Sequence, residues 1–311
     1  MNKTLDIIGI GECMVEFFAE EPLGQARSLQ RSFGGDVLNA LVTAARLGSR
    51  VGFVTQVGRD PFGPGLLEAW LAEGIDTRCA PLVPGENGVY FISLRDGGER
   101  EFTYRRKDSA ASRLSAENLD LWYLQQSRML LLSGISQAVS ESAQDAALRA
   151  ARLVGSGGAL VAFDPNHRPN LWALRGPSEA ARQALEQIEP HLDILLPSFP
   201  DDMAVFGVEG LDVKSAAVAL AERVPRVALK AGAAGAWLAW DGELEHIAPA
   251  VTARVRDTTG AGDAWNGAFL HGLLHSQEPF EAARRANQIA ADKLAFRGAI
   301  APKPWPLRAT F

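Results

Sequence analysis

The segment at residues 257–275 constrains the fold of this chain more than any other part of the sequence. It contains the run Gly260-Ala261-Gly262-Asp263, and an apolar pattern with helical spacing begins directly after it. Small side chains recur every fourth residue along this pattern, at Ala264, Ala268 and Gly272. The spacing predicts a tight glycine turn that leads into a buried helix.

The start of such a helix is suited to binding an anion. Its first backbone N–H groups have no partner within the helix, and the helix dipole places partial positive charge there. Phosphate is a common ligand at this position. Asp263 would be an unfavourable neighbour for a phosphate unless it accepts a proton from a hydroxyl that attacks the phosphorus. The alternative is that Asp263 caps the helix and that the glycines belong to an ordinary loop.

The complete run resembles the second signature of the ribokinase-like (PfkB) carbohydrate kinases. The matching positions are Asp257, Gly260, Gly262, Asp263 and Gly267. The resemblance implies that Asp263 is the catalytic base and that Gly260, Ala261 and Gly262 form an anion hole for the transferred phosphoryl group. Trp265 stands where this family usually has phenylalanine, which keeps an aromatic residue in the core.

Composition excludes several other classes of protein. The 311 residues are 47% hydrophobic and carry a net charge of −6, which is ordinary for a globular enzyme and disfavours nucleic acid as a partner. The two cysteines, Cys13 and Cys79, have no metal-ligand spacing and form no disulfide framework. The sequence contains no apolar run of membrane-spanning length, and its start does not resemble a signal peptide. We therefore expect a cytoplasmic location without membrane contact.

The rest of the chain alternates between strand-like and helix-like segments, which predicts a mostly parallel sheet with helices on both faces. Predicted strands in this alternation are 5–11, 51–57, 128–133, 159–163, 192–196, 226–230 and 235–240. Predicted helices are 36–47, 64–73, 140–153, 178–188, 200–206, 213–223, 260–275 and 279–295. We expect one ribokinase-like domain over residues 1–311, a three-layer α/β/α fold.

Four further short strands are predicted outside the main sheet. They are 15–20, 28–33, 89–94 and 101–105, the last two joined as a hairpin. We interpret the discontinuous segments at about 13–34 and 86–108 as a small β-sheet lid. A sheet of this size would expose an apolar face, so we expect pairing with a second subunit, in a homodimer or a higher homo-oligomer.

A double glycine precedes the first predicted helix. Gly34 and Gly35 are followed by Asp36 and Asn39, which are one helical turn apart. Locally this pattern is typical of a capped core helix. It also resembles the first signature of the family, which implies that these four residues line the sugar site.

Polar residues follow several of the predicted strands, at the sheet edge where ligands bind in such folds. The resemblance implies that Asn166 and Arg168 handle phosphate or substrate, and that Lys230, Gly232 and Gly235 form a loop over the nucleotide. Ser198 and Asp201 stand where the family has Asn and Glu, a motif tied to phosphate and magnesium. On the last helix, Asn287 matches a family position beside the adenine, although a plain helix-face residue would look the same.

Within the family, the chain is most similar to the subgroup that acts on 2-keto-3-deoxygluconate. The segments that carry this similarity are 88–90, 102–110, 132–135 and 168–172. A carboxylate substrate calls for a guanidinium with hydroxyl groups beside it. Tyr104 and Arg106 alternate onto one strand face, and the similarity adds Tyr90 and Arg168. Ala299 departs from this subgroup, which often has an aspartate there as a substrate contact.

The resemblance implies an ATP-dependent, magnesium-dependent kinase that phosphorylates a terminal hydroxyl of 2-keto-3-deoxygluconate. A fructokinase or ribokinase is the alternative within the family, and a non-catalytic sugar- or nucleotide-binding regulator ranks lower because such a protein needs no base. A dehydrogenase is disfavoured, because the Gly9-x-Gly11 pair lacks the third glycine of a dinucleotide-binding turn. The sequence contains no Gly-Lys pair, which excludes a Walker A loop.

Overall fold

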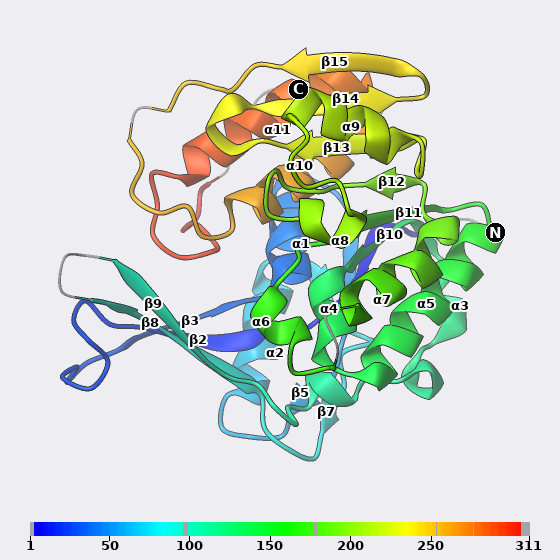
Figure 1. Ribbon diagram of the computed structural model, residues 1–311. Coiled ribbons are helices and arrows are strands. Elements are labelled where there is room, and N and C mark those ends of the chain that lie inside the picture. The colour runs from blue at the N-terminus through cyan, green and yellow to red at the C-terminus, as the bar shows by residue number, and fades with distance from the viewer. Residues whose placement is uncertain (1–2, 96–98, 177–178, 253, 276, 306–311) are drawn as a thin grey trace.

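A computed structural model describes residues 3–95, 99–176, 179–252, 254–275 and 277–305. Over these ranges the chain forms a nine-stranded sheet with helices on both of its faces, and a separate four-stranded sheet that projects from one side (Figure 1). The three-layer α/β/α class predicted from the sequence is confirmed. No helix in the described ranges has the length and apolar character needed to cross a membrane.

The nine-stranded sheet has the order β15-β14-β13-β12-β11-β10-β1-β4-β6. Its strands are β1 (Leu5–Ile10), β4 (Val51–Val54), β6 (Ile75–Asp76), β10 (Ser127–Ser133), β11 (Leu160–Asp164), β12 (Ile194–Leu195), β13 (Arg226–Lys230), β14 (Ala236–Trp240) and β15 (Glu243–Ile247). All neighbouring pairs from β13 to β6 are parallel, whereas the pairs β13–β14 and β14–β15 are antiparallel. Buried parallel strands need apolar side chains on both faces, and every residue of β1 is buried accordingly.

Two apolar clusters fill the two sides of this sheet. One contains residues of α1 (Asp36–Leu47), α2 (Gly63–Ala72), α10 (Ala261–Leu274) and α11 (Pro279–Lys293). The other contains residues of α3 (Leu121–Leu124), α4 (Gly134–Val139), α5 (Glu141–Ser156), α6 (Pro169–Trp172), α7 (Ala180–Ile188), α8 (Met203–Phe206) and α9 (Val213–Ala221). Short 3₁₀ turns lie at Ala111–Arg113, Ala116–Asn118, Glu189–His191 and Gly232–Ala234.

The projecting sheet is the lid expected from the sequence. Its order is β3-β2-β8-β9, formed by β2 (Met14–Phe18), β3 (Gln30–Gly34), β8 (Gly88–Leu94) and β9 (Arg100–Arg105). The pair β2–β8 is parallel, and the other two pairs are antiparallel. The tip of the predicted β8–β9 hairpin, at residues 96–98, lies outside the described residues.

Several predicted boundaries differ from the structure. The predicted end of the strand at 51–57 is wrong, because β4 ends at Val54 and the chain then bends. The next residues form β5 (Val57–Gly58), which pairs with β7 (Leu82–Val83) in a separate two-stranded sheet. β15 was not predicted, because its residues are mostly polar and exposed. The helix predicted at 140–153 continues to Ser156 and is preceded by α4. Residue 178, the predicted start of α7, lies outside the described residues.

The helices α1 and α10 pack closely against each other on one side of the central sheet. At Gly267 in α10, an added Cβ would lie 2.2 Å from the backbone oxygen of Ala40 in α1. Only glycine permits this approach, which brings the first turns of both helices to the same edge of the sheet.

We predict that Gly267→Ala destabilises the fold by about 1–3 kcal/mol, the usual cost of overpacking a core. Gly65 is the matched control, because it is also helical but has open space around its Cβ position. Gly65→Ala should be neutral or stabilise by about 0.5–1 kcal/mol, since alanine favours helix. Urea unfolding of both variants measures this difference, and equal effects would contradict the packing argument.

Candidate active site

The first turn of α10 has the geometry of an anion-binding site. Gly260, its N-cap, has φ 73°, and a Cβ there would lie 2.5 Å from the backbone oxygen of Ala299. A side chain is therefore excluded both by the left-handed backbone and by the neighbouring chain. The Cβ position of Gly262 faces open space. The first turn of this 14-residue helix is therefore approachable by a ligand, although the N–H of Ala261 donates to Thr258 O at 3.2 Å.

Asp263 lies in this first turn, and its carboxylate points toward α1. Its Oδ2 accepts a hydrogen bond of 2.8 Å from Asn39 Nδ2. Burial, with the negative charge of Asp36 nearby, raises the pKa of Asp263 from about 3.8 to about 7. A carboxyl group with this pKa can exchange a proton near neutral pH, as a general base must.

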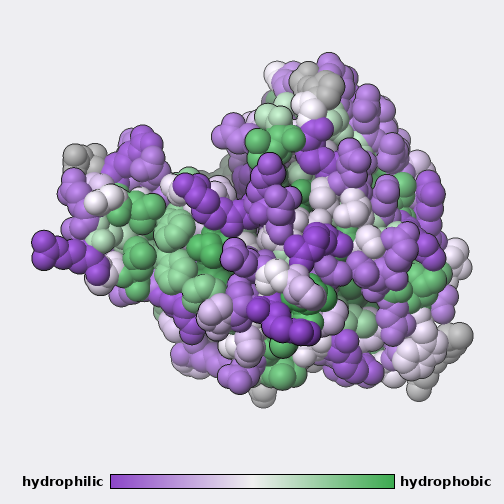
Figure 2. Space-filling view, turned by 90° about the horizontal axis from the view of Figure 1, so that it is seen from below, coloured by the Kyte–Doolittle hydropathy of each residue, from purple (hydrophilic) through white to green (hydrophobic). Residues whose placement is uncertain are grey.

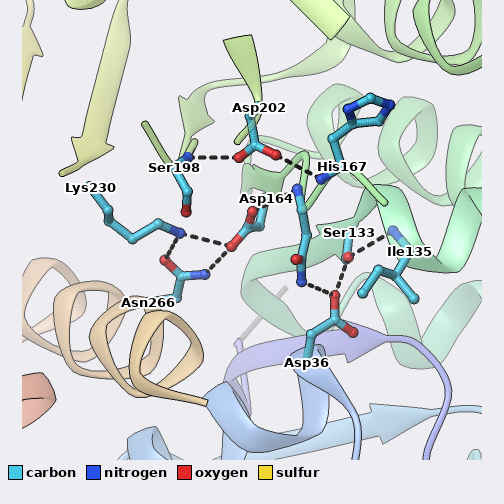
Figure 3. A network of polar contacts seen from close by, with 10 residues as sticks. Asp36, Ser133, Ile135, Asp164, His167, Ser198, Asp202, Lys230 and Asn266 are labelled. Carbon is cyan, nitrogen blue, oxygen red and sulfur yellow. Dashed lines mark hydrogen bonds and ion pairs between the residues drawn. The ribbon is translucent and has the colours of Figure 1, made fainter. Parts of the chain in front are cut away.

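Asp36 is the first residue of α1, and its carboxylate accepts hydrogen bonds from residues at the ends of two strands. It accepts hydrogen bonds from Ser133 Oγ, at the end of β10, and from Asn166 Nδ2, just after β11, the latter at 2.9 Å. Figure 3 shows these contacts converging on one carboxylate. The first-signature residues Gly34, Gly35, Asp36 and Asn39 therefore lie together with Asp263.

Lys230 is buried at the end of β13 and joins two other elements. Its Nζ lies 2.8 Å from Asp164 Oδ2, at the end of β11, and donates to Asn266 Oδ1 of α10 at 2.9 Å. Asn266 Nδ2 completes the triangle by donating to the same Asp164 oxygen at 2.5 Å (Figure 3). The convergence of polar strand ends that the sequence predicted is confirmed by these contacts.

The two neighbouring aspartates after β12 have different environments. Asp201 is exposed, whereas Asp202 is buried and accepts from the backbone N–H groups of His167 and Ser198, both at 2.7 Å. Burial, together with the charge of Asp164, raises the pKa of Asp202 to about 6. The sequence analysis named Asp201 for magnesium, but Asp202 is the one that turns toward the Lys230 triangle (Figure 3).

The segment after Lys230 turns back on itself through glycines. Gly232 (φ 55°) and Gly235 (φ 86°) frame a 3₁₀ turn between β13 and β14. Asn287 of α11 is buried beside the neighbouring edge, where Nδ2 donates to Ile247 O and Ala248 O and Oδ1 accepts from Trp265 Nε1. Its amide is fully engaged in joining α10, α11 and the end of β15.

Tyr90 and Tyr104 of the lid face are cross-strand partners, with ring centroids 5.9 Å apart. The Tyr90 hydroxyl donates to Glu16, so the protein itself uses this group. Tyr104 is 49% exposed and therefore open to a ligand. Arg168, also exposed, lies close enough for its charge to lower the pKa of Tyr104, although burial raises that pKa by more.

Arg106 lies on the same lid face but is largely buried. Its Nη2 forms an ion pair with the buried Glu12, and its guanidinium lies 6.0 Å from the Tyr104 ring centroid. Arg105, which the alternation turns to the other face, is exposed. The predicted sharing of one face by Tyr104 and Arg106 is therefore confirmed, but the guanidinium already faces an internal carboxylate.

Two ion pairs connect the lid to the segments around the α10 turn. Arg100 of β9 contacts Asp257 at 2.7 Å and Thr259 Oγ1 at 3.2 Å, both just before the glycine turn. Arg297 contacts Glu20 at 2.7 Å. The lid therefore lies against the same loop that leads into the anion-binding turn.

Three site residues were missed by the sequence analysis: Ser133, Asn266 and Asp202. Ser133 ends a predicted strand, and Asn266 is three residues after Asp263 on the same helix, so position alone could have indicated both. Asp202 could not be separated from Asp201, because their orientation depends on the turn that follows β12.

The arrangement combines a base, a group of N–H donors and an open aromatic face. Within the described residues, no group of three or more acidic, histidine or cysteine side chains forms a ready metal cage. Magnesium usually binds through one or two carboxylates, waters and substrate phosphates, so carboxylates near an anion turn suit it without such a cage. The geometry therefore suits transfer of a phosphoryl group to a hydroxyl.

Comparisons with known proteins agree with this chemistry. Residues 4–306 match the model of the pfkB family carbohydrate kinases. The chain is 32% identical to 2-dehydro-3-deoxygluconokinase of Escherichia coli (strain K12), covering 97% of this chain and 98% of that protein. The crystal structure of a PfkB protein from Polaromonas sp. JS666 has a TM-score of 0.85 at 28% identity, over 96% of this chain and 97% of that one.

A second solved structure contains ligands. It is an E. coli protein described as a ribokinase II, solved in complex with ATP and Mg²⁺, with a TM-score of 0.85 and 27% identity. The match covers 95% of this chain and 94% of that one.

We predict that Asp263→Asn stabilises the fold at alkaline pH. The folded-state pKa of Asp263, about 7, exceeds the ordinary value of 3.8. The free energy of unfolding therefore decreases as pH rises from about 4 to 7. Asparagine cannot ionise, so the variant does not lose this stability. The loss in the parent is at most about 1.4 kcal/mol per unit of pKa difference, before solvent screening. Urea unfolding should show a larger gain at pH 8 than at pH 5, and an equal gain at both would contradict the raised pKa.

Proposed function

This chain belongs to the pfkB family of carbohydrate kinases, and from that premise we propose that it phosphorylates a terminal hydroxyl of 2-keto-3-deoxygluconate, also called 2-dehydro-3-deoxygluconate, with ATP. The chain is a phosphotransferase with an alcohol group as acceptor. The 2-dehydro-3-deoxygluconokinase relative aligns over nearly the whole of both proteins, which supports this substrate.

The observation that carries the proposal is the position of Asp263. It lies in the first turn of α10, at the anion-binding turn, with a pKa raised to about 7. In the proposed reaction Asp263 accepts the proton of the substrate hydroxyl, and Asn39 orients its carboxylate. The N–H groups of Gly260, Ala261 and Gly262 stabilise the negative charge on the phosphoryl group in the transition state of its transfer. A non-catalytic regulator would have no need of this base.

The use of ATP and magnesium follows from the family. Magnesium, when bound to the nucleotide phosphates, neutralises part of their charge. We propose that Lys230, Asn166 and Ser198 lie toward the phosphates and that Gly232 and Gly235 lie toward the nucleoside. Asn287, whose amide is engaged by Trp265 Nε1, Ile247 O and Ala248 O, supports that edge from within the protein. The buried Asp202 is a better placed magnesium carboxylate than the exposed Asp201, which could act only through water.

The lid supports a substrate that carries a carboxylate. The proposed site lies between Gly34, Gly35 and Asp36 on the core side and Tyr90, Tyr104, Arg106 and Arg168 on the other. Two guanidinium groups near an open aromatic face suit an anionic end, because arginine pairs with carboxylates through a planar fork.

A neutral sugar, as in a fructokinase or ribokinase, is the alternative substrate. Two observations favour it: Ala299 supplies no polar group beside the Gly260 turn, and Arg106 is already paired with Glu12. Activity on both classes of sugar therefore has to be compared directly.

We also propose that the whole chain is a single domain whose lid pairs with that of a second subunit. By register, Phe17, Val89 and Phe91 share one lid face and are only partly buried. Figure 2 shows hydrophobic surface on the underside of the projecting sheet, open to solvent in one copy of the chain. A second lid would cover it.

We predict that Asp263→Asn lowers kcat by roughly 10²–10⁴-fold, the usual contribution of a general base, while ATP still binds. In the parent, kcat should rise with pH through about 7, as the carboxyl group of Asp263 loses its proton. Asp145→Asn, at an exposed position of α5, is the control and should retain parent activity. A coupled assay of ADP release measures this, and parent-like turnover in Asp263→Asn would remove the base assignment.

We predict that Arg106→Leu raises the KM for 2-keto-3-deoxygluconate roughly 10–200-fold, since a charge-assisted hydrogen bond is worth about 1.5–3 kcal/mol. Activity on fructose should change little, because a neutral sugar has no carboxylate to lose. Arg105→Leu, on the opposite lid face, should leave the ratio of the two kcat/KM values unchanged. Parallel losses for both substrates in Arg106→Leu would mean that Arg106 serves the structure of the lid alone.

We predict that light scattering gives a mass of twice 33.4 kDa or a higher multiple. Phe91→Glu should shift the protein toward monomer, because it places a charge on the proposed lid interface. A monomeric parent at micromolar concentration would refute the paired lid.

A further inference from the structure

Glu12 is a buried carboxylate at the base of the lid that the proposed reaction does not use. It follows β1, and its side chain is 3% exposed. Its Oε1 accepts a hydrogen bond of 3.0 Å from Ser109 Oγ, and its Oε2 forms the ion pair with Arg106 Nη2. Apart from that ion pair, Oε2 has no hydrogen-bond partner among the described residues. Glu12 therefore depends on Arg106 for its charge compensation.

The position of Glu12 is set by two glycines. A Cβ at Gly35 would lie 1.9 Å from the backbone oxygen of Glu12, and a Cβ at Gly88 would lie 3.0 Å from its Oε1. Gly35 belongs to the proposed sugar site, and Gly88 begins lid strand β8. Glu12 thus lies where the sugar site meets the base of the lid.

Arg106 is incompletely satisfied in this pair. Its side chain is 12% exposed, its Nε is buried without a hydrogen-bond partner among the described residues, and its Nη2 has no partner there besides the ion pair with Glu12 Oε2. These two nitrogens form one edge of the guanidinium fork, the edge that suits a bidentate carboxylate. An incoming carboxylate could occupy this edge and so compete with Glu12.

We propose that Glu12 is the counter-ion that Arg106 exchanges for the substrate carboxylate, and that Glu12 takes up a proton from solvent when the sugar acid binds. This inference rests on the proposed sugar-acid function. The substrate brings one negative charge, Arg106 turns to it, and protonation of Glu12 removes one negative charge. The net charge of the buried site is therefore unchanged on binding.

The surroundings of Glu12 favour this exchange. Leaving a buried charge without its partner is strongly unfavourable, so protonation follows the loss of Arg106. Burial already raises the pKa of Glu12, against the opposing charge of Arg106, and the negative charge of Asp36 on α1 raises it further. The other titratable neighbour, Cys13, is a buried thiol whose pKa is itself raised. Once Arg106 turns away, burial and the charge of Asp36 raise the pKa of Glu12 with no cation to oppose them, so Glu12 takes up a proton.

Calorimetry of the full-length chain tests the exchange. We would titrate 2-keto-3-deoxygluconate into the protein with saturating ADP at pH 7, in phosphate and in Tris buffer, whose ionisation enthalpies differ. The expected result is an uptake of about one proton per site, with the Kd rising by up to tenfold per pH unit above neutrality. Fructose should bind without proton uptake. Binding of the sugar acid without proton uptake would overturn the proposal, because Arg106 would then hold both carboxylates.

Two variants locate the proton. Glu12→Gln should abolish the uptake and bind the sugar acid more tightly, since it leaves Arg106 without a competing charge. Glu16→Gln is the matched control, because Glu16 is also a buried lid glutamate with a raised pKa. Uptake that persists in Glu12→Gln but is lost in Glu16→Gln would overturn the proposal. The parent measurement remains decisive if Glu12→Gln fails to fold.

The kinase assay separates this inference from the proposed function. If the parent phosphorylates the sugar acid but binds it without proton uptake, the counter-ion exchange is wrong and the function stands. If the parent phosphorylates only fructose, the substrate proposal fails, and the exchange fails with it.

Discussion

The crowding of carboxyl groups at one edge of the central sheet is the constraint on which this active site depends. Asp36, Asp164, Asp202 and Asp263 come from different elements and meet near the buried Lys230. Parallel strands place their carboxyl ends at the same edge, so this crowding follows from the topology. Burial, together with this crowding, raises the pKa of Asp263 and makes its carboxylate basic enough to accept a proton near neutral pH.

Amide and hydroxyl groups hold the carboxylates of this edge in place. Asn39 holds Asp263, Asn166 and Ser133 hold Asp36, and Asn266 holds Asp164. Neutral donors orient a carboxylate at a lower cost in basicity than a paired arginine would impose. Arginines are used elsewhere, at the contacts of the lid with the core, where Arg100 and Arg297 form ion pairs.

The lid and the core meet through charged groups that a bound substrate can influence. Arg100 contacts Asp257, just before the anion-binding turn, while Arg106 is paired with Glu12 at the base of the lid. A ligand between lid and core therefore lies near ion pairs that connect both ends of the site. Under the proposed exchange, specificity for a charged or a neutral sugar depends on the free energy of separating Arg106 from Glu12, as well as on the pocket shape.

The sequence by itself determined the fold class and most of the core of the site. Periodicity predicted α1 and α10 and the strands beneath them, because buried helices and parallel strands need unbroken apolar patterns. The glycine turn before Asp263 could be identified because few residues tolerate that backbone and that close approach. The signature runs by themselves indicated that Asp36, Asn39 and Asp263 belong to one site.

Only the tertiary structure decided which polar groups face one another. Three features depend on contacts across 25 to 94 residues of chain: the bend after Val54, the choice of Asp202 over Asp201 as the inward carboxylate, and the pairing of Arg106 with Glu12. Local sequence carries no signal for such pairs, because a side chain's partner is set by how distant segments pack. The pKa of Asp263 belongs to the same class, since burial and the charge of Asp36 exist only once α1 and α10 are in contact.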